Sequence, residues 1–339
     1  MSNGLQVIPS VRVLRTIYHC PHGQRCSAGD YNSACYDCRR NRRTHQNSSN
    51  PLGGAVTRMK PQPFDYVAPE TLDGALDLLA QVGDDAVIVA GGQSLVPILN
   101  LRLARPELVI DLRRVTELAR FEICEKGLRA GAMANVLEVE EHPDIHLVPG
   151  LHNALRQIAH PQIRSRTTIG GSVAHADPAA ELPALLVALD GDIVLQSKIR
   201  GERTVSADDF FTGPMMTVRE PDELLISVCF PAHPGPVAVL EVAKRPGDFA
   251  MVGAVVGYAI ADGVISNPSI TLFGVAGRPV RMASAETALR GAIPDTDSFL
   301  AATELVREEV DPRADAYASS EYRRQVAATL VGRALISLS

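Results

Sequence analysis

A break in composition near Met59 constrains this chain more than any other feature of its sequence. Residues 1–58, here called the leader, carry eight arginines, no lysine and two acidic residues, a net charge of +6. The remaining 281 residues, the body, carry 25 basic and 37 acidic residues, a net charge of −12. Periodic apolar patterns begin directly after Met59. The fold must therefore come from the body, which is long enough to bury its own core.

The leader allows three interpretations. Its cysteines and neighbouring histidines indicate a zinc module, although only one pair has CxxC spacing. Its Arg-rich, acid-poor composition indicates a targeting peptide, although it lacks the apolar segment of a secretory signal. The abrupt start of the folding pattern favours the third interpretation, in which residues 1–58 are disordered or foreign to the natural protein. The four cysteines are Cys20, Cys26, Cys35 and Cys38.

Composition excludes several classes of protein. The chain is 46% hydrophobic and 21% charged, which is typical of a globular protein and not of a disordered or fibrous one. No apolar run approaches the ~18 residues that a membrane-spanning helix requires. The net charge of −6, the absence of Trp and the 4% aromatic content argue against nucleic acid as a partner. We expect a cytoplasmic protein without a membrane span.

Strand and helix patterns alternate along the first part of the body. Thr71 can cap a helix of apolar residues at helical spacing, and Gly83 can end it. The β-branched run at residues 87–90 predicts a buried strand. Further strands are expected at residues 107–112, 128–133, 192–197 and 223–230. Further helices are expected at residues 151–160 and 177–189, the second with Asp177 and Pro178 as its N-cap and first residue.

A proline-rich stretch, residues 231–236, predicts a linker between two domains, residues 59–234 and 235–339. The second domain shows three strand patterns, and Asp262-Gly263 between the last two predicts a hairpin turn. Three helices are expected after the strands. The strands are expected at residues 237–244, 252–261 and 270–275, and the helices at 284–290, 298–309 and 321–338.

Two glycine stretches, Gly91-Gly92 and Gly170-Gly171, predict close approach of backbone N–H groups to a ligand. Two such stretches would suit the adjacent phosphates of a dinucleotide, and neither is a GxGxxG or Walker motif. The alternative is that both are tight turns without a ligand. A side chain at Gly91 or Gly171 is expected to release a dinucleotide from a chain that stays folded. Hydroxyl groups stand nearby on Ser94, Thr168 and Ser172.

Glu181 follows the second glycine stretch by nine residues. It either places a favourable charge near a helix start or accepts hydrogen bonds from a ribose or base. His175 and Asp177 are interpreted as helix caps and loop packing, because no third metal ligand is spaced nearby.

Two stretches together identify a family resemblance: AGGQSL through LRL at residues 90–103, and IRSRTTIGGSVAHADPAAELPALLVAL at residues 163–189. They resemble the FAD-binding medium subunit of molybdenum hydroxylases, the family of aerobic carbon monoxide dehydrogenase and bacterial xanthine dehydrogenase-type enzymes. The resemblance runs from Met59 to the C-terminus, and the leader has no counterpart. It implies an α+β fold: a two-part PCMH-type FAD-binding domain, then a C-terminal domain with a three-stranded antiparallel sheet and helices.

The resemblance implies FAD contacts at matching positions. Glu181 corresponds to the family's acidic ligand, Ile158 to an apolar position against the flavin, and Lys244 to a lysine of the C-terminal domain. The backbone near Leu225 and Ile226 corresponds to a contact with the isoalloxazine. The first glycine stretch contributes Ile88, Val89, Ala90, Gly91, Gly92, Gln93, Ser94 and Leu95. The second contributes Thr168, Ile169, Gly170, Gly171 and Ser172.

The resemblance also implies an electron-transfer subunit of an oxidoreductase. A large subunit would carry the molybdenum cofactor and a small subunit two [2Fe–2S] clusters, assembled as a dimer of heterotrimers. The body has only Cys124 and Cys229, and a cluster needs about four thiolates, so any cluster must lie on another chain. No catalytic residue or metal ligand is expected in the body, because the cofactor carries the redox chemistry.

Two alternatives remain open at this point. One is a self-sufficient FAD oxidoreductase of the same fold, similar to UDP-N-acetylenolpyruvoylglucosamine reductase. The other belongs to a different class, a Cys-rich metal-binding regulatory module that uses the body as a scaffold.

A chain shortened to begin at Met59 is expected to keep its flavin content and its thermal stability. The reason is that the leader has no periodic apolar face with which to pack on the body. Flavin absorbance and a melting curve, measured beside the full chain, test this. A marked drop in either quantity would show that the leader belongs to the fold.

Overall fold

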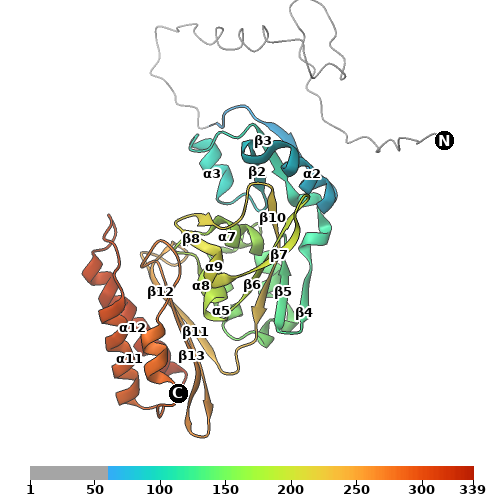
Figure 1. Cartoon of the computed structure of the whole chain (residues 1–339). Helices are drawn as coiled ribbons and strands as arrows, with labels where there is room; N and C mark the ends of the chain where they lie inside the picture. Colours follow the sequence, from blue (N-terminus) through green and yellow to red (C-terminus); the bar gives the residue numbers. More distant parts are fainter. Residues whose placement is uncertain (1–59) are drawn as a thin grey trace, which may run out of the picture. The chain divides into compact units, whose positions relative to one another are not determined.

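A computed structural model describes residues 60–339 (Figure 1). The leader, with its four cysteines and its three interpretations, lies outside the described residues. Residues 61–339 form one compact unit. None of the helices in this part of the chain has the length and apolar character needed to cross a bilayer.

The first layer of the structure is a small parallel sheet. Its strands are ordered β1-β3-β2, and all neighbours pair in parallel. Helix α2 packs on it through Leu76 and Leu79, and its predicted ends are confirmed. Thr71 caps it by accepting a hydrogen bond from the N–H of Gly74, and Gly83 ends it with a φ of 60°. The bounds are β1 Asp65–Val67, α2 Leu72–Val82, β2 Ala86–Val89, α3 Leu95–Asn100 and β3 Leu108–Asp111.

The second layer is a five-stranded antiparallel sheet, ordered β4-β5-β10-β6-β7. Three of its strands were predicted, and the two edge strands were not. The edge strands are short, largely accessible to solvent and without a continuous apolar run, so their sequences carry a weak strand signal. The strands are β4 Phe121–Cys124, β5 Gly127–Gly131, β6 Asp192–Ser197, β7 Gly201–Ser206 and β10 Glu223–Pro231.

Short helices cover this second sheet, and two of them differ from expectation. The helix expected at residues 151–160 ends at Gln157, and Pro161 does not end it but opens a separate helix, α6. The helix expected at residues 177–189 begins only at Glu181, because Asp177 accepts a hydrogen bond from the N–H of Ala179 and closes a turn. The helices are α4 Val136–Glu140, α5 Leu151–Gln157, α6 Pro161–Arg164, α7 Ile169–His175, α8 Glu181–Ala188 and α9 Ala207–Phe210.

The C-terminal domain has the three predicted strands and a two-residue fourth strand, β14, in an antiparallel sheet ordered β11-β12-β13-β14. The hairpin turn is confirmed: Asp262 and Gly263 have φ values of 52° and 79°, as a primed turn requires. The three expected helices follow, and α12 packs on the sheet beside α11 (Figure 1). The bounds are β11 Val237–Ala243, β12 Ala250–Ala261, β13 Val264–Phe273, β14 Val280–Arg281, α10 Ala283–Leu289, α11 Thr296–Glu309 and α12 Ser320–Ser337.

Helix α8 joins the two domains. All eight of its residues are buried, which is the pattern of a helix enclosed on every side. It packs on α5 on one side and on β12 and β13 on the other. Leu185 of this helix and Phe273 of β13 belong to one continuous apolar core. The C-terminal sheet is therefore held firmly against the rest of the molecule.

At Gly91 the first glycine stretch lies against the backbone of residues 166–167, just before the second glycine stretch. A Cβ atom added there would overlap the carbonyl oxygen of Arg166 and lie 3.1 Å from the Cα atom of Thr167. Both neighbours are backbone, so neither can move aside as a side chain could. The expectation that a side chain at Gly91 leaves a folded chain is therefore corrected: this glycine is required by the packing of one segment on the other.

Replacing Gly91 by Ala is expected to lower the free energy of unfolding of the ligand-free chain by about 1–3 kcal/mol, the usual cost of overpacking. Urea denaturation measures this. Gly213→Ala is the matched control, since a Cβ at Gly213 meets only the Met216 side chain, 3.6 Å away. Equal urea midpoints for the Gly91→Ala variant and the parent chain would refute the contact.

Candidate functional site

A cavity of about 540 Å³ lies where the two sheets of the first domain meet the C-terminal domain. Its wall is built from both glycine stretches, from β10 and from the loop that follows β11. The structure thus brings together segments separated by up to about half of the body. The predicted site residues that line it are Ile88, Ala90, Gly91, Gly92, Gln93, Ser94, Leu95, Ile158, Thr168, Gly170, Gly171, Ser172, Glu181 and Leu225.

Four predicted site residues do not line the cavity. Val89 is buried in an apolar cluster with Leu99 and Val109, and Ile226 packs against another cluster that contains Leu76 and Leu79. Ile169 is fully buried in the main core. Lys244 is exposed and stands one residue beyond the end of β11.

The first glycine stretch presents a row of unpaired amides. The N–H groups of residues 91–95 donate to no protein acceptor among residues 60–339. Gly92 has a φ of 75°, a conformation that glycine adopts freely and that turns successive N–H groups toward one side. Backbone donors at a cavity wall need a partner, and an anion fits this row. The prediction of an anion-binding stretch after β2 is supported by this geometry.

The second glycine stretch is built differently, and its interpretation as a second row of free amides is corrected. It forms the first turn of α7, where Thr168 caps the helix by accepting a hydrogen bond from Gly171. The N–H groups of Ile169 and Gly170 donate to the carbonyls of Ala134 and Ala132, and that of Ser172 donates to Thr168. This stretch offers the cavity its hydroxyl groups and small side chains.

Glu181 opens helix α8 and is only 8% exposed at the cavity wall. Burial raises the pKa of its carboxyl to about 8, and the negative charges of Glu241 and Asp177 add to the rise. Glu241 lies on the face of β11 that also carries Val237 and Val239, the face packed toward the first domain. Burial raises the pKa of Glu241 to about 7. Glu181 therefore holds its proton near neutral pH and can donate a hydrogen bond as well as accept one.

Sequence reasoning missed several parts of the cavity wall, among them the loop after β11 and Arg219. The loop contributes Gly247, Asp248 and Phe249, and the Phe249 side chain is 73% exposed at the rim. An aromatic residue directly after a Pro-Gly-Asp turn sequence, in a chain with 4% aromatic residues, was a usable signal. Arg219, from the loop before β10, also lines the cavity, and no local pattern marked it.

Replacing Glu181 by Gln is expected to change how the stability of the ligand-free chain depends on pH. The folded pKa of about 8 exceeds the ordinary value of 4.5. The stability contributed by the protonated group is therefore fully present below pH 4.5 and is lost as pH rises through 8. The Gln variant should match the parent near pH 4.5 and exceed it by on the order of 2–4 kcal/mol at pH 9.

Urea denaturation between pH 4.5 and pH 9 measures this difference. Glu138→Gln, at an exposed glutamate, is the control and should follow the parent curve throughout. If the free energies of unfolding of the parent and the Glu181→Gln variant changed equally with pH, the raised pKa of Glu181 would be refuted.

Comparison with known proteins agrees with this arrangement. Residues 62–233 match the family described as the FAD binding domain in molybdopterin dehydrogenase, and residues 238–338 match the CO dehydrogenase flavoprotein C-terminal domain. The nicotine 6-hydroxylase medium subunit of Paenarthrobacter nicotinovorans is 38% identical, and the match covers 82% of this chain and 98% of that protein. The carbon monoxide dehydrogenase medium chain of Hydrogenophaga pseudoflava is 34% identical, with 82% and 97% covered.

A solved structure gives the same result. Quinoline 2-oxidoreductase from Pseudomonas putida 86 superposes with a TM-score of 0.79 at 35% identity, covering 82% of this chain and 98% of that one. Both family matches, the relatives and the shared fold lead to one conclusion: this chain belongs to the FAD-binding medium subunits of the molybdenum hydroxylases.

Proposed function

We propose that the chain binds FAD in this cavity and passes electrons from the iron–sulfur clusters of a partner subunit to an external acceptor. The observation that carries the proposal is the row of unpaired amides at residues 91–95, because it lines a cavity shared by both domains. When bound, FAD would supply the redox chemistry, and this chain would bind, orient and shield it.

The residues present fit FAD. The amides of residues 91–95 suit the pyrophosphate, and the hydroxyl groups of Thr168 and Ser172 add donors beside them. Glu181 can hydrogen-bond a hydroxyl group of the cofactor in either protonation state, and when protonated it can also donate to a ring nitrogen. Ile158 supplies an apolar surface for a flat ring.

The residues of the cavity wall indicate how FAD is oriented in the cavity. We place the isoalloxazine near Ile158 and the loop at residues 247–249, because the exposed Phe249 marks an end that electrons can reach from outside. The adenine then occupies the other end, whose wall includes the aliphatic side chains of Leu79, Leu112 and Leu224.

We propose that the electrons come from another chain, because residues 60–339 cannot hold an iron–sulfur cluster. Cys124 and Cys229 are the two cysteines among the described residues, and their sulfur atoms lie 3.3 Å apart. Two thiols are too few for an iron–sulfur cluster. We therefore propose a small [2Fe–2S] subunit and a large molybdenum-cofactor subunit as partners, in a cytoplasmic dimer of heterotrimers. The names "medium subunit" and "medium chain" of the relatives support such partners.

We also propose two domains, residues 59–234 and 235–339, with residues 1–58 outside the working protein. The gap between the two family matches, which end at residue 233 and resume at residue 238, supports the boundary.

The flavin of the isolated chain is expected to be reduced by a chemical reductant but not by an organic substrate. Dithionite should bleach its flavin absorbance, whereas no organic substrate should do so until the partner subunits are added. Replacing Glu181 by Ala should weaken FAD binding by roughly 1–3 kcal/mol, the cost of leaving a buried polar group of the cofactor without its hydrogen-bond partner. Anaerobic absorbance spectra and a flavin titration measure both effects. Reduction of the isolated chain by an organic substrate, or by NAD(P)H with turnover of a second substrate, would favour the self-sufficient oxidoreductase instead.

A further inference from the structure

Arg219 is the one lysine or arginine among the described residues that line the cavity. It lies in the loop between β9 (Met216–Thr217) and β10, and its side chain is half-buried. Keeping the guanidinium charged here costs free energy, since burial lowers the pKa of Arg219. A cation kept in a cofactor cavity at a cost needs an explanation.

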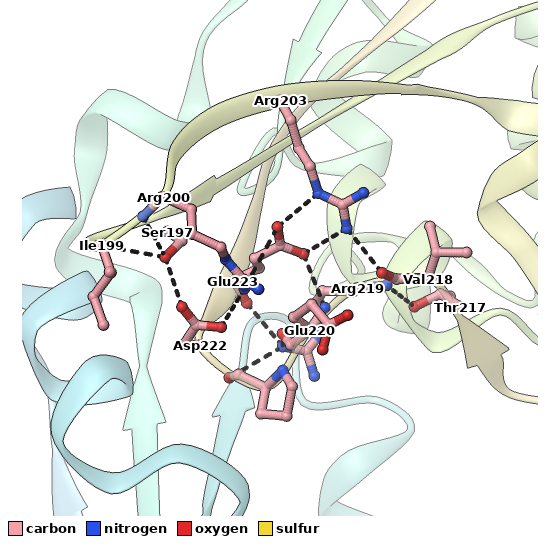
Figure 2. Close-up of polar contacts among 11 residues, drawn as sticks. Ser197, Ile199, Arg200, Arg203, Thr217, Val218, Arg219, Glu220, Asp222 and Glu223 are labelled. Carbon is pink, nitrogen blue, oxygen red and sulfur yellow. Dashed lines mark hydrogen bonds and ion pairs between the residues drawn. The ribbon is translucent and has the colours of Figure 1, made fainter.

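The loop fixes Arg219 along one edge of its guanidinium (Figure 2). Its Nη1 atom donates to the backbone carbonyls of Glu220, Pro221 and Glu223 at 2.9, 3.5 and 2.8 Å. Within residues 60–339, Nε and Nη2 donate to no protein acceptor. The loop therefore orients the guanidinium and leaves part of its donor set available.

Two of the carboxylates near Arg219, those of Glu223 and Asp222, are paired with other groups, as Figure 2 shows. Arg203 holds Glu223 through two hydrogen bonds of 2.7 and 2.8 Å. Ser197 and Arg200 hold Asp222. Among the described residues, Arg219 itself has no ion pair within 4.0 Å. Its positive charge is therefore available to a ligand of the cavity.

Arg219 lies in the half of the cavity away from the first glycine stretch. Its hydrogen bond to the carbonyl of Glu223 places it beside Leu224, which packs with Leu79 and Leu112 in one apolar cluster. Asp84, whose charge also acts on Arg219, comes just before β2, and Gly91 follows the other end of that strand, five residue steps or about 16 Å of extended chain beyond Ala86. Arg219 is therefore placed to meet a ring at the far end and not the pyrophosphate.

We infer that Arg219 recognises the adenine end of FAD and so selects the dinucleotide over FMN; this rests on the proposed function. A guanidinium anchored at one edge can stack its flat face on an aromatic ring or donate from its remaining N–H groups to ring nitrogens. Leu79, Leu112 and Leu224, which line the same end, provide the apolar surroundings that a purine needs. Arg219 acts as a specificity-determining residue.

The test titrates the cofactor-free chain with FAD and with FMN and follows flavin fluorescence. Replacing Arg219 by Gln should raise the Kd for FAD roughly 5- to 30-fold and leave the Kd for FMN unchanged, because FMN lacks the adenine. ADP should compete with FAD less well for the variant than for the parent. Arg219→Lys keeps the charge without the flat group and should lose most of the FAD preference as well.

Arg307→Gln is the control, since Arg307 lies on α11, pairs with Glu304 and does not line this cavity. It should leave both affinities unchanged. Circular dichroism melting curves show whether each variant is folded. Equal losses for FAD and FMN would overturn the inference and make Arg219 a support of the loop, and an unchanged FAD affinity would also overturn it. A parent chain that binds neither flavin would instead overturn the proposed function itself.

Discussion

The backbone contact at Gly91 is the constraint on which the rest of the site depends. At this point the segment leaving β2 lies directly on the segment that leads into α7, and there is no room for a side chain between them. The contact joins the parallel sheet to the antiparallel one. The unpaired amides of residues 91–95 and the hydroxyl groups of Thr168 and Ser172 line the same cavity. The two glycine stretches thus share one location but differ in their backbone, since the N–H groups of the first have no protein acceptor among residues 60–339 and those of the second are bonded within the fold.

The buried helix α8 fixes the third wall of the cavity. Its core is continuous with that of the C-terminal sheet, and Ser269 of β13 donates a 2.5 Å hydrogen bond to the carbonyl of Ala188. A continuous core resists sliding, because interiors are packed as densely as organic crystals. The loop at residues 247–249 is therefore held at the rim, and the C-terminal domain belongs to the site as much as the first domain does.

The charges of the cavity are consistent with an anionic dinucleotide. The pyrophosphate would accept hydrogen bonds from backbone amides. These donors are neutral, so they hold the anion without a charged side chain beside it. The nearby carboxyls of Glu181 and Glu241 have raised pKa values, so near neutral pH they add less negative charge than two ordinary glutamates would. The single arginine stands apart, at the end where a ring and not a phosphate is expected. Donor type and position thus divide the cavity into a phosphate region and two ring regions.

Local rules determined much of this protein from sequence alone. The ends of α2 follow from Thr71 and Gly83, and the hairpin from Asp262-Gly263, because each depends on the backbone preferences of one or two residues. The two glycine stretches also identified the family and about a third of the residues that line the cavity. The edge strands β4 and β7 escaped prediction, since pairing with a neighbour and not their own composition makes them strands.

Only the tertiary structure decided which donors are available at the site. The amides of Ile169 and Gly170 are occupied because the fold brings them to Ala134 and Ala132, more than thirty residues earlier, while those of residues 91–95 meet no such acceptor. Arg219 enters the cavity because its own loop carbonyls hold it there and neighbouring arginines occupy the carboxylates. Whether a polar group is free depends on what packs against it, and that is a property of long-range contacts, which no local pattern contains.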